Sequence, residues 1–493
     1  MENGSSAVAV TQIGRAQPRR WLALAVLCMA TFIVILDGSI VFVAVPSMAK
    51  GLHLTPGSTQ WVVSAELLSF GGLLLLGGRM ADLLGRRRLF IIGSLLLAAS
   101  SLLCGLAWNG DVLIGARVIE GVSAAIMTPT ALSILMNMFS EVRERNIALG
   151  AWSSAGGVGG TIGALVGGPL TEGPGWGWIF FVNVPVALLM AALSPLVLRE
   201  SYNRERARTF DIAGALTSTV AMVLLVYTIV NAPNVGWSSA RTIGQLIAFV
   251  ALIGVFVAIE SRSAAPLMPM KYFRRSGFLG GNIVLLIVGM SVNGGMGFVM
   301  TEYAQVILGY SPVQFGLMFA VMTVLTIVGS SLAGGPLVRR FGPLPVALVS
   351  LVLVGAAFGT LTNIAVHGSF VHDILLGMIL FGPGLGAGFV AASIVALVGV
   401  PEQDSGVAGG VTTASFHIGG ALGIAILSTV AISNAAGADP ATAAVTGFRA
   451  AFAAGIVFAA VGVLASLVLL RKRALASATV TQLPSTGRQR DAA

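Results

Sequence analysis

Four ionisable residues that could exchange protons lie inside long apolar segments: Asp37, Glu66, Arg117 and Glu120. On a helix, Arg117 and Glu120 share one face because they are three residues apart. Side chains of this kind at lipid depth are costly and by default functional. Three carboxyls beside one guanidinium cannot all stay ionised in a low dielectric, so at least one is expected to bind a proton. A carboxyl that gains and loses a proton near neutral pH is what a proton-coupled carrier needs.

Each of these residues also has an interpretation without coupling chemistry. Arg117 and Glu120 could form a neutralised structural pair, and Asp37 could cap an unwound end of its segment. Glu66 could lie at a water-filled entrance. His417 is a fifth proton-coupling candidate, although a histidine between glycine-rich segments is more often a satisfied polar residue.

The composition places most of this chain in lipid. Of 493 residues, 56% are hydrophobic and 10% are charged, whereas a soluble domain carries about 25% charged residues. This balance excludes a soluble enzyme and a disordered chain. A net charge of +9 would suggest nucleic acid in a soluble protein, but here the basic residues lie between apolar runs and indicate topology. The cysteines and histidines lack ligand spacing, so no metal site and no cofactor are expected.

Fourteen apolar segments are each long enough to cross a hydrocarbon core of about 30 Å as a helix. The runs are continuous rather than alternating, which favours helices over a barrel. With the N-terminus inside, nearly all basic residues fall on the cytoplasmic side, so we expect both tails, 1–20 and 471–493, to be cytoplasmic at the inner membrane. The segments are 21–43, 59–78, 89–108, 112–138, 147–170, 178–198, 212–231, 241–260, 278–304, 313–337, 345–366, 371–399, 406–433 and 448–470.

A weak internal repeat divides the chain. The connection after the second span, 77–87, is similar to the connection after the tenth span, 334–342. This offset predicts a six-helix bundle over 21–198, two inserted helices with their loops over 199–277, and a second six-helix bundle over 278–470. Repeated halves around a midplane site are a transporter design, so we expect an all-α membrane protein with fourteen transmembrane helices and no enzymatic activity.

The connection after the second span carries the most specific motif. It reads G-x-x-x-D-x-x-G-R-R and comprises Gly78, Asp82, Gly85, Arg86 and Arg87. Glycine permits a tight turn, and the charges could form a conformational latch that opens and closes as two bundles rock. A solvated basic loop is the alternative. The motif resembles the signature loop of the major facilitator superfamily, and this resemblance implies the major facilitator fold.

Further segments are similar to the 14-spanner drug:proton antiporters of the EmrB/QacA type. They are the stretches at 36–46, 60–63, 117–121 and 180–185. Glu66 and Glu120 stand where that family usually has Tyr and Gln, and Ala164 replaces a proline of its fifth-span motif. The glycines of that span still allow close helix packing: Gly159, Gly163, Gly167 and Gly168.

The resemblance implies proton-driven export of amphipathic drugs or antibiotics by alternating access, with protons as the coupling ion. The expected partners are a small-molecule substrate and the lipid bilayer, without nucleic acid, for a monomeric protein. Alternatives are a carrier of another small metabolite or lipid without drug efflux, and a channel or membrane-embedded enzyme. For Glu302, near the outer end of its segment, we favour exposure at the membrane interface, and the aromatic candidates could be lipid-facing or packing residues. The candidate residues of the substrate cavity are Trp61, Phe70, Trp152, Glu302 and Phe416.

Overall fold

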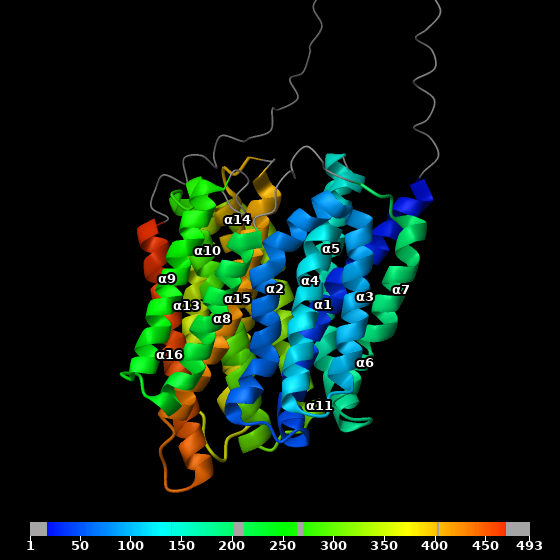
Figure 1. Cartoon of the computed structure of the whole chain (residues 1–493). Helices are drawn as coiled ribbons and strands as arrows, with labels where there is room; N and C mark the ends of the chain where they lie inside the picture. Colours follow the sequence, from blue (N-terminus) through cyan, green and yellow to red (C-terminus); the bar gives the residue numbers. More distant parts are fainter. Residues whose placement is uncertain (1–16, 140, 202–211, 264–269, 402–403, 470–493) are drawn as a thin grey trace, which may run out of the picture.

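The structure is a computed structural model that describes residues 17–139, 141–201, 212–263, 270–401 and 404–469. This part of the chain is helical and contains no strand, and its long helices run side by side (Figure 1). The first helix begins and the last helix ends at the same end of the bundle (Figure 1). We call this end the terminal end and the opposite one the far end.

The helices fall into three consecutive groups along the chain. The first group is α1 (Gln17–Gly51), α2 (Pro56–Leu84), α3 (Arg86–Gly105), α4 (Gly110–Met138), α5 (Val142–Glu172), α6 (Trp178–Phe181) and α7 (Asn183–Val197). The inserted pair is α8 (Ile212–Val235) and α9 (Ala240–Arg262). The last group is η1 (Met270–Tyr272), α10 (Ser276–Gly289), η2 (Met290–Val299), η3 (Glu302–Ile307), α11 (Pro312–Leu332), η4 (Ala333–Leu337), α12 (Val338–Phe341), α13 (Pro343–Leu361), η5 (Phe370–Ile374), α14 (Leu375–Leu397), α15 (Ser405–Ser433) and α16 (Pro440–Leu469).

The predicted all-helical membrane architecture is confirmed. Twelve helical stretches among the described residues are long and apolar enough to cross a membrane. The other two predicted spans correspond to α5, whose first turn is charged, and to α8, whose apolar stretch is Leu216–Ala232. Every predicted segment therefore coincides with a helix or a short series of helices.

Two predicted helix ends are wrong. The first helix does not end near residue 43, because α1 continues through Pro46 to Gly51. The predicted connection over 79–88 is also almost entirely helical, since α2 runs to Leu84 and α3 begins at Arg86. Gly85 makes the whole turn alone with a φ of 103°, a left-handed conformation that glycine adopts without the steric cost of a Cβ atom.

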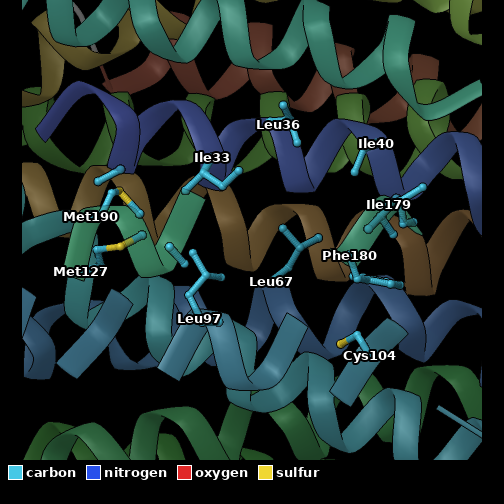
Figure 2. Packing of buried hydrophobic residues seen from close by; sticks show 14 of the residues in the cluster. Ile33, Leu36, Ile40, Leu67, Leu97, Cys104, Met127, Ile179, Phe180 and Met190 are labelled. Carbon is cyan, nitrogen blue, oxygen red and sulfur yellow. The ribbon is translucent and has the colours of Figure 1, made fainter. Parts of the chain in front are cut away.

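Each large group has its own buried core. The first core draws mainly on α1 to α7, and Figure 2 shows some of its members, among them Ile33 of α1, Met127 of α4 and Met190 of α7. The second core draws mainly on α10 to α16. In lipid, such cores are held by close packing rather than by water exclusion.

The two groups meet mainly along two helix pairs. At the α2–α15 pair, a Cβ atom on Gly71 would lie 3.2 Å from the carbonyl oxygen of Ala414. At the α5–α11 pair, a Cβ atom on Gly168 would lie 2.4 Å from the Cα atom of Val313. The backbone N–H of Val313 also donates to Glu172 Oε1 at 2.8 Å, so the far ends of α5 and α11 are held together.

The inserted helix α8 crosses the α2–α15 seam. Thr429 Oγ1 on α15 donates to the carbonyl oxygen of Ile229 on α8 at 3.2 Å. A Cβ atom on Gly57 of α2 would lie 3.9 Å from Val230 of α8. Its partner α9 is largely exposed and apolar, with Ile247 64% exposed, as expected for a helix that faces lipid.

Candidate functional site

Four buried ionisable side chains meet between α1, α2 and α4. Arg117 Nη1 lies 2.6 Å from Asp37 Oδ2 and 2.7 Å from Glu120 Oε2. Arg117 Nη2 lies 3.6 Å from Glu66 Oε2. The guanidinium is fully buried, and the three acidic residues are at most 7% exposed. We call Asp37, Glu66, Arg117 and Glu120 the Arg117 cluster.

The geometry of the carboxyls differs in three respects from the arrangements considered as alternatives. Glu120 does not form an isolated pair, because Arg117 contacts Asp37 and Glu66 as well. Asp37 lies within α1 rather than at an unwound end. Glu66 is buried rather than placed at a water-filled entrance. The structure therefore brings together all the predicted carboxyls of the first group around one cation.

Neutral side chains from two further helices, α3 and α7, complete the cluster. Asn183 Nδ2 donates to Asp37 Oδ1 at 2.8 Å, and Ser101 Oγ donates to Glu120 Oε1 at 2.5 Å. Cys104 Sγ lies 3.5 Å from Glu120 Oε2. Sequence reasoning missed these residues. A signal existed for Asn183, because Pro185 lacks an N–H and breaks the helix at the junction of α6 and α7 that carries this asparagine.

The three carboxyls are held unequally. Asp37 and Glu120 each accept short hydrogen bonds from Arg117 and from a neutral side chain. In the described part of the chain, the longer ion pair with Arg117 Nη2 is the one polar contact of the Glu66 carboxyl, and Nη2 itself has no hydrogen-bond partner. Glu66 is thus the carboxyl that can change its protonation state with the fewest interactions lost.

A glycine lets α4 approach α2 beside the cluster. A Cβ atom on Gly121 would lie 2.4 Å from the carbonyl oxygen of Glu66 and 2.1 Å from Ser69 Oγ. Gly115, also on α4, has nothing within 4 Å of such an atom. Close helix contact through small residues is a standard packing mode in membranes, and here it fixes the height of Glu66 against Arg117.

Gly121→Ala should therefore destabilise the protein and displace Glu66. Overpacking of this kind costs about 1–3 kcal/mol, and the backbone of α2 cannot move aside as a flexible side chain would. The measurement is the melting temperature of the purified protein in detergent, together with transport by membranes that contain equal amounts of protein. Gly115→Ala on the same helix is the matched control and should behave as the unmodified protein. Equal melting temperatures for the two variants would contradict this account of the α2–α4 contact.

The glycine row of α5 positions the helix that carries Asp37. Cβ atoms on Gly159 and Gly163 would lie 2.4 Å from the carbonyl oxygen of Phe32 and 2.6 Å from that of Leu36. Gly167 faces the side chains of Ile40 and Val43 on the same helix. Gly168 instead faces α11 of the last group, so the row serves both the first core and the contact between the groups.

The latch residues lie at the terminal end, and the contacts described for them are with α4 and with the segment that directly follows α7. The backbone N–H of Arg87 donates to Glu200 Oε1 at 3.0 Å, and its Nε lies 3.7 Å from Glu200 Oε2. The backbone N–H of Arg86 donates to the carbonyl oxygen of Ser201 at 3.2 Å. A Cβ atom on Gly78 would be in ordinary contact with Pro129. The side chain of Asp82 lies outside the described residues.

The remaining candidates lie at two other places. His417 of α15 packs on Phe70 of α2 with ring centroids 4.2 Å apart and on Phe416 at 5.4 Å, so these three rings meet at the seam between the groups. His417 Nδ1 is buried, and no partner for it is present in the described chain. Trp61 and Trp152 pack on the first core.

Glu302 lies apart from these rings, near the far end. The residue is half-buried, its Oε1 atom is buried, and it lines a cavity between the two groups together with Gln60 and Phe448. Simple exposure at the membrane interface, which the sequence favoured for Glu302, is therefore not what the structure shows.

The fold and the motifs agree with comparisons to known proteins. The family model described as Major Facilitator Superfamily matches residues 27–424 and again residues 283–489. This chain belongs to the major facilitator superfamily. It is 37% identical to the puromycin resistance protein of Streptomyces alboniger over 457 residues, which cover 91% of this chain and 90% of that protein. It is 34% identical to the cephamycin export protein CmcT of Amycolatopsis lactamdurans, covering 84% of this chain and 86% of that protein.

Other similarities point the same way. The tetracenomycin C resistance and export protein of Streptomyces glaucescens is 32% identical over 87% of this chain and 79% of its own length. Among solved structures, the nucleoside transporter NupG has a TM-score of 0.64 at 12% identity and covers 92% of this chain and 100% of its own. A bacterial homologue of the lysosomal transporter Spinster has the same TM-score at 17% identity, covering 95% of this chain and 100% of its own. The superfamily member described here is therefore a multi-pass membrane transporter, a carrier rather than an enzyme.

Proposed function

We propose that this transporter exports amphipathic drugs or antibiotics across the cytoplasmic membrane in exchange for protons, as an antiporter of the 14-spanner type. Export of antibiotics is supported by the relatives, which are resistance and export proteins for puromycin, tetracenomycin C and cephamycin. The insertion of α8 and α9 between the two six-span groups supports the 14-spanner type. The terminal end is then the cytoplasmic end, with both termini inside, and the far end is the outer end.

The observation that carries the proton step is the charge imbalance of the Arg117 cluster. Three carboxyls surround one guanidinium in a fully buried site. If all three carboxyls were ionised, two buried negative charges would remain without a cation, which is strongly unfavourable in a low dielectric. Glu66 is assigned as the carboxyl that takes up the coupled proton, because Asp37 and Glu120 are each fixed by two hydrogen bonds.

The helix that carries Glu66 also contacts the last group. On α2, Glu66 faces Arg117 of the first group, whereas Gly71, about one turn on, packs against Ala414 of α15. Protonation of Glu66 removes its attraction to Arg117 Nη2, so α2 gains freedom to shift against α4. Because α2 forms part of the seam, this shift changes the contact between the two six-helix bundles. Alternating access then couples proton entry at the outer end to substrate release, for a monomer with its substrate near the midplane.

A susceptibility panel with vesicle transport tests this proposal. In a host that lacks its own pumps, the chain should raise resistance to at least one of puromycin, tetracenomycin C and a cephamycin, and an uncoupler should abolish the increase. In inverted vesicles, adding that drug should dissipate an imposed pH gradient, because drug and protons move in opposite directions. Drug movement that is equally fast with and without the pH gradient would overturn proton coupling and favour a carrier without a proton step.

A further inference from the structure

A second carboxylate lies in a cavity of its own, away from the Arg117 cluster. The cavity has a volume of about 340 Å³ and lies near the far end between the first and last groups. It is lined by the connection and helix ends of α1 and α2, by η2 and η3, and by α15 and α16. Glu302 is the one charged residue among the described residues that line it. The other polar lining residues are Thr59, Gln60 and Ser428.

Two acceptor atoms in this cavity have no partner. Glu302 Oε1 and Gln60 Oε1 are both buried, and neither has a hydrogen-bond partner in the described part of the chain. A buried acceptor without a partner costs about 1–3 kcal/mol, and more when it is charged. No lysine, arginine or histidine contributes to the described lining, so the negative charge has no internal counter-ion there. Both acceptors would be satisfied by a ligand that brings a positive charge and a donor.

The backbone around Glu302 is also unusual. The stretches η2 and η3 on either side of Thr301 are π-helical over ten and six residues. This conformation is rare and is found most often at functional sites. The side chain of Thr301 donates to the carbonyl oxygen of Gly297 and so occupies a backbone acceptor of the widened helix. The chain thus keeps a less favourable helix geometry at the position that presents Glu302 to the cavity.

The apolar lining complements the single charge. Phe298 and Phe448 are among the lining residues, and an aromatic face attracts an organic cation in addition to burying its apolar body. The volume lies at the lower end of the range of about 300–1,000 Å³ for small-molecule sites. Beside the cavity, α8 contacts both α2 and α15 near Gly57 and Thr429. The helix α8 therefore lies against the α2–α15 side of the cavity.

We propose that this cavity is a binding site for a monovalent, partly aromatic organic cation, with Glu302 as its anionic anchor. This cavity is separate from the Arg117 cluster. The cavity lies where the last group contacts α2, whereas the cluster lies within the first group. Only the role of this site in transport rests on the proposed function. In an exporter, a cationic substrate occupies the cavity near the outer end before it is released. Binding itself requires no assumption about transport.

Binding of ethidium to the purified full-length protein tests the anchor. Glu302→Gln keeps the shape of the side chain and removes its charge, so the dissociation constant for ethidium should rise about tenfold, which is about 1.4 kcal/mol. Binding of the neutral dye Nile red should not change. Asp111→Asn is the matched control, because Asp111 is an exposed carboxylate in the first turn of α4 at the same end. Equal ethidium affinities for Glu302→Gln and Asp111→Asn would overturn the proposal.

Protection of an introduced cysteine from a thiol reagent tests whether the bound cation lies in the cavity. Ala435 lines the cavity and is exposed, so Ala435→Cys in a Cys28→Ser background should react with a charged maleimide added from the outside. Ethidium should slow this reaction several-fold, and Glu302→Gln should remove the protection while Asp111→Asn retains it. Protection that is absent, or that persists with Glu302→Gln, would overturn the assignment. Neither assay uses a pH gradient. The two assays therefore test this binding site independently of proton-coupled export.

Discussion

Arg117→Gln should abolish transport and lower the stability of the protein more than any other single substitution in the first group. Arg117 is fully buried and pairs with Asp37, Glu66 and Glu120. Removing one partner of a buried ion pair costs about 3–5 kcal/mol, because the remaining charge is left without compensation. Here three carboxyls lose their cation at once. The measurements are the yield of folded protein after extraction, its melting temperature, and drug transport in vesicles.

A compensated variant separates the loss of stability from the loss of transport. Arg117→Gln combined with Asp37→Asn and Glu120→Gln leaves a neutral, hydrogen-bonding set around Glu66. Replacing a buried ionic group as a whole is often neutral for stability, so this triple variant should regain most of the melting temperature of the unmodified protein. It should not regain transport, since the cation that responds to Glu66 is gone.

The control for these variants is Arg241→Gln. Arg241 is exposed on α9 and donates to the hydroxyl of Tyr227 at 3.1 Å, and exposed polar contacts contribute little to stability. This variant should match the unmodified protein in both assays. If Arg117→Gln also matched it, or if the triple variant were less stable than the single one, the cluster would not be the electrostatic unit described here.

The transmembrane helices were predictable because lipid imposes a simple rule. Each apolar run must be about 20 residues long and satisfy its own backbone, and the helices observed agree with the predicted segments. Helix ends were less predictable. Pro46 suggests an end for α1, yet the helix continues to Gly51, as membrane helices can when neighbouring groups satisfy the freed carbonyl. The turn at Gly85 is shorter than the motif suggested.

The candidate site was predictable only within one helix. Arg117 and Glu120 are neighbours on α4, and their spacing alone shows this. The positions of Asp37 and Glu66 depend on how α1 and α2 pack against α4, and no local pattern contains that information. The same holds for Asn183 and Ser101, which are ordinary polar residues in the sequence and reach the cluster only through the packing of α3 and α7. The cavity of Glu302 needs both groups and therefore leaves no sequence signal at all.

Glu66→Gln should abolish transport driven by a pH gradient while leaving the protein folded. The carboxyl of Glu66 contributes one ion pair at 3.6 Å, so its loss costs little stability, in contrast to Asp37→Asn, which weakens the short contact with Arg117 and a hydrogen bond from Asn183. Glutamine has the shape of the protonated carboxyl but cannot release a proton. The measurement is uptake into inverted vesicles under an imposed pH gradient, with ethidium as a cationic substrate and Nile red as a neutral one.

Three outcomes of this experiment lead to different conclusions. If Glu66 carries the coupled proton, Glu66→Gln stops the gradient-driven uptake of both dyes, yet still exchanges external for internal dye when no gradient is applied. If Glu66 only attracts cations, the same variant loses ethidium uptake and spares Nile red, which is the pattern expected for Glu302→Gln. If both dyes are still driven by the gradient, the proton is carried elsewhere. His417 then becomes the next candidate, because it lies at the α2–α15 seam, on Phe70 of the same helix as Glu66, with Nδ1 buried and free of any partner in the described chain.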